Sequence, residues 1–564
     1  MKVIIVGGVA GGASAAARLR RLDERAEIMI FERSGYISYA NCGLPYFIGG
    51  VIEEEGDLTL QTPESFYSRF RIDVRVRHEV TGIDRVAKTV TVRSLETGDE
   101  FTEHYDKLIL APGARPIRPN IPGVDSDRIR TLRTVEDTLS IHRLVEETAL
   151  QSALVIGGGF IGLEMAENLL RRGLQVTLVE KAPQVLSALD RDMASFVHAR
   201  LRQAGVHLLL NQSVTAFRTE GEDVTAALAD GGKIRAQLVL LALGVTPENT
   251  LARDAGLALG ERGSIAVDAH MRTSDPNIYA VGDAVQVRHG VTGQETLIAL
   301  AGPANKQGRI AADHICGLES EYRGSWGSSV IKIFDMTVAA TGLNERAAKA
   351  AGLDCGKVVL SPASHASYYP GGRPMTMKVL FDRGSLRLLG AQIVGYDGVD
   401  KRIDVLATAM QAGMTADRLK DLDLAYAPPF SSAKDPVNMA GFIIENVSRG
   451  LVKQFHYEDV AQLPRDGSVT LLDVRTSGEY AAGHAPGFIH IPVDSLRDRL
   501  SELDPAKPVY VMCQSALRSY IACRILSQHG FDCYNFSGGY RFYAANAAEE
   551  LLAGPNTSCG APVQ

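Results

Sequence analysis

The sequence predicts an α/β protein of several domains, and three observations lead to that fold class. A pattern of strand, glycine-rich loop, helix and strand occurs twice in the first half of the chain. Beyond residue 325 the pattern changes to short strands broken by glycine and proline, with a helix over 401–412. After residue 466 strands and a helix begin again, in a chain whose 564 residues are too many for one ordinary domain.

Composition and charge exclude several classes of function. The formal net charge is −7, and 45% of the residues are hydrophobic, which is the ordinary mix of a globular protein. Binders of nucleic acid or of membrane surfaces carry clustered basic charge, so we expect neither kind of partner. No apolar run is long enough to span a bilayer, and the N-terminus has no signal-peptide pattern. The seven cysteines are sparse and lack metal-ligand spacing, so we expect a reducing, cytoplasmic location and no metal site.

The first strand–loop–helix unit begins at the N-terminus. A strand over 3–6 leads into a glycine loop over 7–12 and an alanine-rich helix over 13–22. The next strand ends at Glu32, 20 residues after Gly12, where an acidic side chain can bind the ribose of a dinucleotide. Val9 takes the place of the usual second glycine, so this loop by itself indicates a nucleotide site less strongly than the second copy.

The second unit follows the dinucleotide-binding pattern fully. Gly157, Gly159 and Gly162 come between a strand over 153–156 and a helix, where they allow a tight turn, a close approach of the pyrophosphate and close helix packing. Glu180 ends the next strand, 18 residues after Gly162. A carboxylate there would bind a ribose 2′-OH and repel a 2′-phosphate, which favours NADH over NADPH. The two units predict two Rossmann-like dinucleotide-binding domains.

Two later segments complete a pattern of known order, Leu-Ile-Leu-Ala-Pro-Gly over 108–113 and the stretch 273–283 that ends in Gly-Asp. Together with both glycine units they resemble the flavoprotein disulfide reductases, over about residues 1–445. The resemblance implies that the first unit binds FAD, that the second binds NADH, that Asp283 bonds the ribityl chain of the flavin, and that the protein is a homodimer. The cofactor-binding residues that it implies are Gly7, Gly8, Ala10, Gly12, Glu32, Arg33, Ala111, Gly113, Gly157, Gly159, Phe160, Ile161, Gly162, Glu180, Gly244, Asp283 and Ala301.

Cys42 is the candidate redox-active residue. Dithiol members of the family carry a second cysteine three or five residues later, where this chain has Pro45 and Phe47, so a disulfide relay within the protein is excluded here. The single-cysteine branch remains, which comprises coenzyme A-disulfide reductases, persulfide reductases, and NADH peroxidases or oxidases. The surroundings of Cys42 resemble the coenzyme A-disulfide type most, and Ala10 stands where peroxidases usually have a histidine. The alternative for Cys42 is an inert buried thiol.

One thiol suffices for this chemistry when the substrate supplies the second sulfur. We expect the Cys42 thiolate to attack a disulfide or persulfide, and reduced flavin to clear the sulfur that remains on Cys42. Tyr368 and Tyr426 match positions from which coenzyme A-disulfide reductases reach the partner's site, and their hydroxyl groups would stabilise a leaving thiolate. The alternative is that both are ordinary aromatic residues of the dimer interface.

Coenzyme A is the substrate group that the resemblance implies. Arg18 and Arg21 are three residues apart and therefore share one face of the first helix, where two guanidinium groups suit phosphate binding. The alternative is a solvated helix face without a ligand. The implied substrate-binding residues are Ser14, Arg18, Arg21, Ser38, Asn41, Asn305 and Lys434.

The C-terminal region carries a second sulfur signature. A strand over 509–512 runs into Cys513, with Arg518 five residues later at the start of a helix. Backbone N–H groups, the helix N-terminus and this arginine favour a thiolate and can hold a persulfide. The segment 466–555 resembles a single rhodanese domain, because related phosphatase and arsenate-reductase loops have one residue more. The alternative is a docking module in which Cys513 is silent.

These observations define the expected architecture and activity. The chemistry is FAD-dependent, NADH-using reduction of small persulfide, polysulfide or coenzyme A-disulfide substrates at Cys42, with sulfane sulfur handled at Cys513. The alternative is an NADH peroxidase or oxidase in which Cys42 cycles through a sulfenic acid. The expected domains are an FAD-binding domain (1–115 and 250–325), an NADH-binding domain (116–249), an α+β dimerisation domain (326–445), a linker (446–465), an α/β rhodanese domain (466–555) and a tail (556–564).

Overall fold

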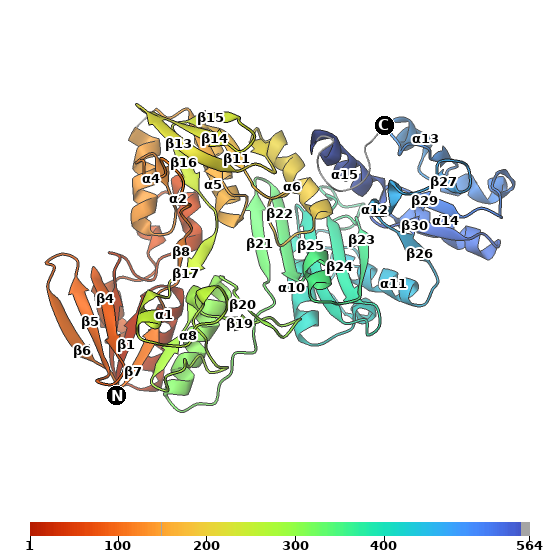
Figure 1. Ribbon diagram of the computed structural model, residues 1–564. Coiled ribbons are helices and arrows are strands. Elements are labelled where there is room, and N and C mark those ends of the chain that lie inside the picture. The colour runs from red at the N-terminus through yellow and green to blue at the C-terminus, as the bar shows by residue number, and fades with distance from the viewer. Residues whose placement is uncertain (148, 554–564) are drawn as a thin grey trace. The chain divides into compact units, whose positions relative to one another are not determined.

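A computed structural model describes residues 1–147 and 149–553, so the predicted tail lies outside the described residues (Figure 1). The chain forms two compact units, one of residues 1–181 and 205–327, the other of 182–204 and 328 onward. The α/β fold class predicted from the sequence is confirmed, since both units contain strands and helices throughout. Among the described helices, none has the length and apolar character that a membrane span needs.

The first sheet of the first unit is parallel and has a different kind of layer on each face. Its strands in spatial order are β18 (Ile278–Ala280), β7 (Lys107–Leu110), β1 (Lys2–Val6), β2 (Glu27–Glu32) and β3 (Asp73–Val76). Helices α1 (Ala10–Leu22) and α8 (Ala301–Ile315) pack on one face through Leu19 and Ile310. An antiparallel sheet of β4 (His78–Asp84), β5 (Thr89–Ser94) and β6 (Glu100–His104) covers the other face. Burial on both faces explains why β1 is a continuous apolar run.

The second sheet repeats this plan around the second glycine loop. Its parallel strands are β12 (His207–Leu209), β11 (Gln175–Val179), β10 (Ser152–Ile156), β16 (Leu238–Leu241) and β9 (Ile129–Arg130). Helix α5 (Phe160–Arg171) follows β10, as α1 follows β1. An antiparallel sheet of β13 (Val214–Glu220), β14 (Asp223–Leu228) and β15 (Lys233–Ala236) packs on one face. Each parallel sheet therefore ends a central strand at a glycine loop.

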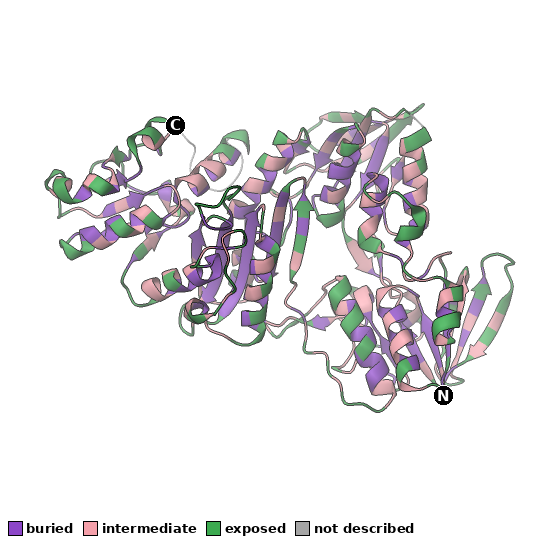
Figure 2. Cartoon of the chain, turned by 180° about the vertical axis from the view of Figure 1, so that it is seen from behind, coloured by how far each residue is buried: buried purple, intermediate pink, exposed green. Residues whose placement is uncertain are grey.

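The second unit begins with an antiparallel sheet whose central strands are buried (Figure 2). Its strands in spatial order are β21 (Ser329–Ile333), β22 (Met336–Gly342), β25 (Leu388–Gly395), β24 (Thr376–Asp382) and β23 (Cys355–Leu360). Helix α10 (Val399–Gln411) packs against β22 and β25. Helix α6 (Arg191–Gln203), which the sequence assigned to the NADH-binding domain, also packs on this sheet. The buried Lys378 ammonium group holds it there by bonding Asp190 and Asp192.

The last sheet is parallel and carries the second candidate cysteine. Its strands are β26 (Lys453–Phe455), β30 (Cys533–Phe536), β29 (Val509–Met512), β27 (Thr470–Asp473) and β28 (Ile489–His490). Helix α14 (Leu517–Gln528) follows β29, and α15 (Gly539–Ala553) ends the described chain. Strand β26 lies within the predicted linker 446–465 and pairs with β30. Its three residues are too few to show a strand pattern in the sequence.

Candidate active sites

The first glycine loop is built so that side chains are excluded from it. Gly7 has φ +98°, and a Cβ there would lie 2.2 Å from the carbonyl oxygen of Ala111. A Cβ on Gly12 would lie 1.9 Å from the Gly7 oxygen, so the helix can pack closely only because both are glycine. Glu32 accepts a hydrogen bond from the Gly8 N–H at 2.8 Å. Its carboxylate therefore lies beside the loop, where a bound ribose would meet it.

The second glycine loop leaves room where a pyrophosphate would approach. Gly157 has φ +110°, and a Cβ on Gly162 would lie 1.9 Å from the Gly157 oxygen. A Cβ on Gly159 would meet no heavy atom within 4 Å. Helix α5 begins directly after it, and no side chain caps its first N–H groups. Open space before an uncapped helix N-terminus fits the phosphates of a dinucleotide.

Both loops have the acidic side chain that the sequence predicts. Glu180 accepts a hydrogen bond from the Gly158 N–H at 2.6 Å, in the manner of Glu32 and Gly8. Burial raises the pKa of Glu32, and the hydrogen bonds from Gly8 and Ser34 oppose this. Exposed side chains of Phe160 and Ile161 stand at the start of α5.

The remaining predicted cofactor residues lie around these loops. Asp283 lies in a short 3-10 helix, η4 (Gly282–Ala284), and its carboxyl group accepts no hydrogen bond from any described residue. Burial raises the pKa of Asp283 while Arg133 lowers it. A half-buried carboxyl group without a hydrogen-bond donor suits a hydroxyl-bearing ligand such as a ribityl chain. The others are Gly113 and Gly244 at positive φ, Ala10 at the start of α1, Ala111 after β7, and exposed Arg33 and Ala301.

Cys42 is solvent-exposed in the short 3-10 helix η1 (Asn41–Gly43), so it is not an inert buried thiol. Partial removal of water around the thiol raises the pKa of Cys42, and the charges of Glu164 and Asp283 raise it further. Glu164 lies on α5 and accepts a hydrogen bond from the Tyr46 hydroxyl at 3.4 Å. Burial raises the pKa of Glu164 to about 7. The first unit therefore brings a reactive sulfur, a titrating carboxyl group and a phenol together.

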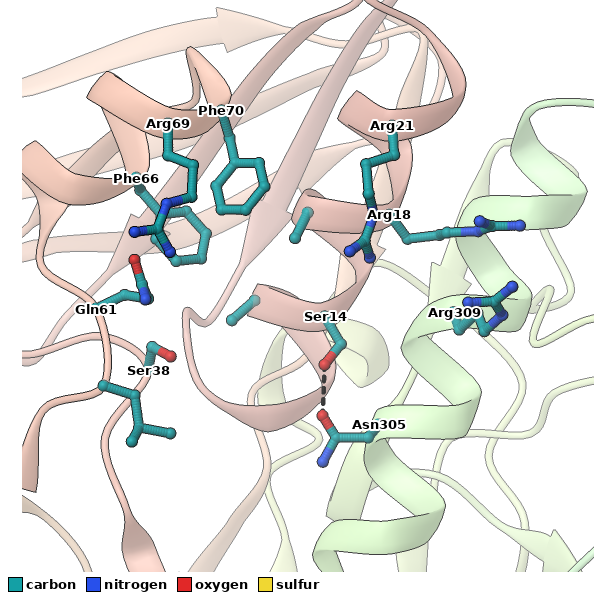
Figure 3. A pocket seen from close by; sticks show the side chains of 13 residues that line it. Ser14, Arg18, Arg21, Ser38, Gln61, Phe66, Arg69, Phe70, Asn305 and Arg309 are labelled. Carbon is teal, nitrogen blue, oxygen red and sulfur yellow. Dashed lines mark hydrogen bonds between the residues drawn. The ribbon is translucent and has the colours of Figure 1, made fainter.

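A pocket of about 460 Å³ lies between α1, α8 and helix α3 (Pro63–Phe70) (Figure 3). Five of the seven predicted substrate residues line it, namely Ser14, Arg18, Arg21, Ser38 and Asn305. Exposed Asn41 is not among its lining residues, and exposed Lys434 belongs to the second unit. Ser14 donates a hydrogen bond to Asn305, and Arg18 extends toward α8, where its Nε lies 2.6 Å from Asp313.

The pocket also contains residues that the sequence did not single out. Arg69 faces Arg21 across the pocket, and Arg309 borders it from α8 (Figure 3). Phe66 and Phe70 form its apolar side, with their rings in an edge-on contact at 5.6 Å. No motif marks α3, and only its return to the first helix in space reveals these residues. Of the guanidinium groups, those of Arg21 and Arg69 form no ion pair with any described residue.

The two predicted tyrosines of the second unit meet each other. Their hydroxyl oxygens lie 2.5 Å apart, and both side chains are exposed. Arg402, which is buried, holds the two loops that carry them. Its guanidinium group donates to the carbonyl oxygens of Ser364 and Phe430 and pairs with Asp435.

The Cys513 loop lies between β29 and α14, and Cys513 is buried at its base. The hydroxyl group of Ser519 lies 3.2 Å from the Cys513 Sγ and donates to it. The loop turns into the helix at Ala516, which has φ +72°. Arg518 points to Glu479, with both N–O distances below 2.9 Å. The predicted cysteine, arginine and helix N-terminus are therefore together, with Ser519 as an addition.

Three family models match the chain. The pyridine nucleotide-disulphide oxidoreductase model matches residues 1–308, and the dimerisation domain of that family matches 328–436. A rhodanese-like domain model matches 456–546. Both resemblances inferred from the sequence are thereby confirmed.

Individual relatives cover one or both parts. A coenzyme A disulfide reductase of Staphylococcus aureus (strain JH9) is 37% identical over 443 residues, which are 78% of this chain and 99% of that protein. The structure of reduced Bacillus anthracis CoADR-RHD has a TM-score of 0.95 and 47% identity, covering 97% of this chain and 98% of the other. The NAD-dependent persulfide reductase from A. fulgidus has a TM-score of 0.91 and 39% identity, covering 96% and 100%.

Proposed function

The chain belongs to the pyridine nucleotide-disulphide oxidoreductase family and carries a rhodanese-like domain, and from this we propose that it reduces persulfide, polysulfide or coenzyme A-disulfide substrates at Cys42. The family implies use of FAD and NAD(H). We propose FAD for the first glycine loop and NADH for the second, with Glu180 selecting against a 2′-phosphate. The named relatives, a coenzyme A disulfide reductase and a persulfide reductase, favour this function over an NADH peroxidase.

The observation that carries the proposal is an exposed single thiol at the end of a pocket-lining segment. Ser38 lines the arginine-bordered pocket, and Cys42 follows four residues later. Arg21 and Arg69 supply two guanidinium groups for the phosphates of coenzyme A, and Phe66 and Phe70 supply apolar surface. A coenzyme A ligand bound there would direct its thiol end along 38–42. A peroxide needs no such pocket.

The proposed chemistry at Cys42 is nucleophilic displacement at sulfur. With a disulfide RSSR, the Cys42 thiolate forms a mixed disulfide with one RS group and releases the other as RS⁻. With a persulfide RSSH, it takes the outer sulfur and releases RSH. When bound, FAD would pass two electrons from NADH to the sulfur on Cys42. The Tyr368–Tyr426 pair, reaching from the partner subunit of a homodimer, would protonate the leaving thiolate.

The parts outside the first unit complete the proposal. The dimerisation-domain match supports a homodimer. We place the sulfane-sulfur site of the rhodanese-like domain at Cys513, with Arg518 favouring its thiolate. The domain boundaries and the cytoplasmic location remain predictions from the sequence.

Anaerobic NADH oxidation with separate oxidants tests the proposal. We expect the full-length protein to turn over with coenzyme A persulfide and coenzyme A disulfide, and faster than with hydrogen peroxide. Cys42→Ser should abolish that turnover, because the hydroxyl group is a poor nucleophile toward sulfur. Faster turnover with peroxide, or an active Cys42→Ser protein, would contradict the proposal.

A further inference from the structure

We propose that Cys513 takes its sulfur from an organic persulfide with an uncharged thioalkyl group, and discriminates against thiosulfate. This rests on the proposed function, which makes Cys513 the sulfur acceptor, and adds the chemical class of the donor. The inference comes from the charges and the apolar side chains around the Cys513 loop.

Both arginines near the loop are already paired with carboxylates. Arg518 donates from two nitrogens to the two oxygens of Glu479, at 2.7 and 2.8 Å. Arg475 pairs with Asp473, and both of these side chains are buried. The hydrogen bonds from Arg518 lower the pKa of Glu479 to about 2, so its carboxylate stays charged at any physiological pH. The two positive charges are thus balanced by two negative ones.

The loop itself is suited to one negative charge on sulfur. The N-terminus of the twelve-residue helix α14 and the Ser519 hydroxyl group face this position, the latter at 3.2 Å from the Cys513 Sγ. Thiosulfate is a dianion whose sulfonate group would remain outside, next to Glu479. Because a carboxylate repels a sulfonate and the arginine charges are balanced, this approach is disfavoured. An organic persulfide carries charge only on its outer sulfur.

The rim of the loop offers hydrocarbon instead of charge. Leu517, between the loop and Arg518, has 64% of its surface exposed. Ile521 is four residues later on the same face of α14 and is 41% exposed. Exposed apolar side chains next to a reactive cysteine suit a thioalkyl arm, which would lose water on contact.

The transfer is balanced without another reactant. The Cys513 thiolate attacks the outer sulfur of RSSH, a bond forms between the two sulfurs, and the S–S bond of the donor breaks. The leaving RS⁻ takes the proton of the persulfide and departs as RSH, and Cys513 keeps the sulfane sulfur as a persulfide anion.

Sulfur loading of Cys513 in the full-length protein without NADH tests this. The donors are thiosulfate and the persulfide of N-acetylcysteamine, and the readout is the mass gain of the Cys513 peptide over time. We expect the wild-type protein to load faster from the persulfide. Glu479→Gln should raise the thiosulfate rate about three-fold, because it removes the repelling charge at the loop mouth. Leu517→Ser should lower the persulfide rate.

Glu502→Gln is the matched control, because Glu502 forms a similar two-bond pair with Arg499, at 2.6 and 2.7 Å. It should leave the ratio of the two rates unchanged. Equal or faster wild-type loading from thiosulfate would overturn the inference, as would a Glu479→Gln ratio equal to that of the control. Thermal melting checks that each variant is folded. Cys42-dependent NADH oxidation, measured separately, shows whether the proposed function itself fails.

Discussion

The hydroxyl oxygens of Tyr368 and Tyr426 lie 2.5 Å apart, although 58 positions separate the two residues in the sequence. One hydroxyl group donates to the other, so the pair keeps one phenolic proton for a third group. The hydrogen bond to Tyr368 raises the pKa of Tyr426. The pair therefore stays protonated at neutral pH and is able to donate to a thiolate when one is produced.

Removing one hydroxyl group of this pair should slow the reaction more than it weakens binding. We expect Tyr426→Phe to lower kcat with coenzyme A persulfide about ten-fold or more, because the leaving thiolate loses its donor. KM for the persulfide should change little. Steady-state NADH oxidation measures both constants.

Tyr369→Phe is the control for this change, because Tyr369 is an adjacent exposed phenol whose ring contacts His365 instead. Its kcat should equal that of the wild-type protein. A Tyr426→Phe enzyme with unchanged kcat would show that the pair is only part of an interface.

Arg402 should control the same step from a distance. It is buried and bonds the carbonyl oxygens of Ser364 and Phe430, which belong to the two tyrosine loops. Arg402→Lys keeps the charge beside Asp435 but loses the forked donor geometry. We therefore expect a lower kcat with the persulfide, an unchanged KM for NADH, and a lower melting temperature. Combining it with Tyr426→Phe should add little to the loss in kcat, because both changes act on one hydroxyl pair.

The sequence predicted the parts of the fold that depend on local patterns. Glycine loops ending at Gly12 and Gly162, and the acidic strand ends at Glu32 and Glu180, have fixed spacing within one strand–helix unit, and the structure places them as expected. The Cys513 loop is a continuous segment of the same kind. Such motifs are visible because one short stretch of chain contains all their chemistry.

Features that depend on distant contacts were not visible. Arg69 enters the pocket only because α3 packs beside α1, and no pattern around it differs from a solvated helix face. Helix α6 follows β11 in the sequence, yet Lys378 of β24 bonds Asp190 and Asp192 at its start. The pairing of Arg518 with Glu479 also spans 39 positions. Residue type alone shows neither where a helix packs nor which charge is neutralised.

The charge of Glu164 should be readable in the reactivity of Cys42. Glu164 has a pKa near 7, so its carboxylate is charged mainly above that pH, where it raises the pKa of Cys42. Glu164→Gln removes this charge, lowers the pKa of Cys42 and increases the thiolate fraction. Above pH 7 we expect alkylation of Cys42 by iodoacetamide to be about three times faster than in the wild-type protein. Below pH 7 the rates should converge, because the wild-type carboxyl group is then mostly protonated.

Peptide mass analysis of the alkylated holoenzyme measures this without relying on turnover. Glu100→Gln, which removes an exposed carboxylate on β6, serves as the control and should not change the profile. Coinciding wild-type and Glu164→Gln profiles would exclude an electrostatic role of Glu164 at this thiol.

Arg21 and Arg69 should determine which substrates bind tightly, because they are the pocket's two guanidinium groups without an ion-pair partner among the described residues. A charge-assisted hydrogen bond to phosphate contributes about 1.5–3 kcal/mol, so Arg21→Ala or Arg69→Ala should raise KM for coenzyme A persulfide about ten-fold or more. The persulfide of N-acetylcysteamine has no phosphate, and its KM should stay as in the wild-type protein. An equal rise for both substrates would mean that the substitution disturbs α1 or α3 as a whole. No rise for either would move the coenzyme A site out of this pocket.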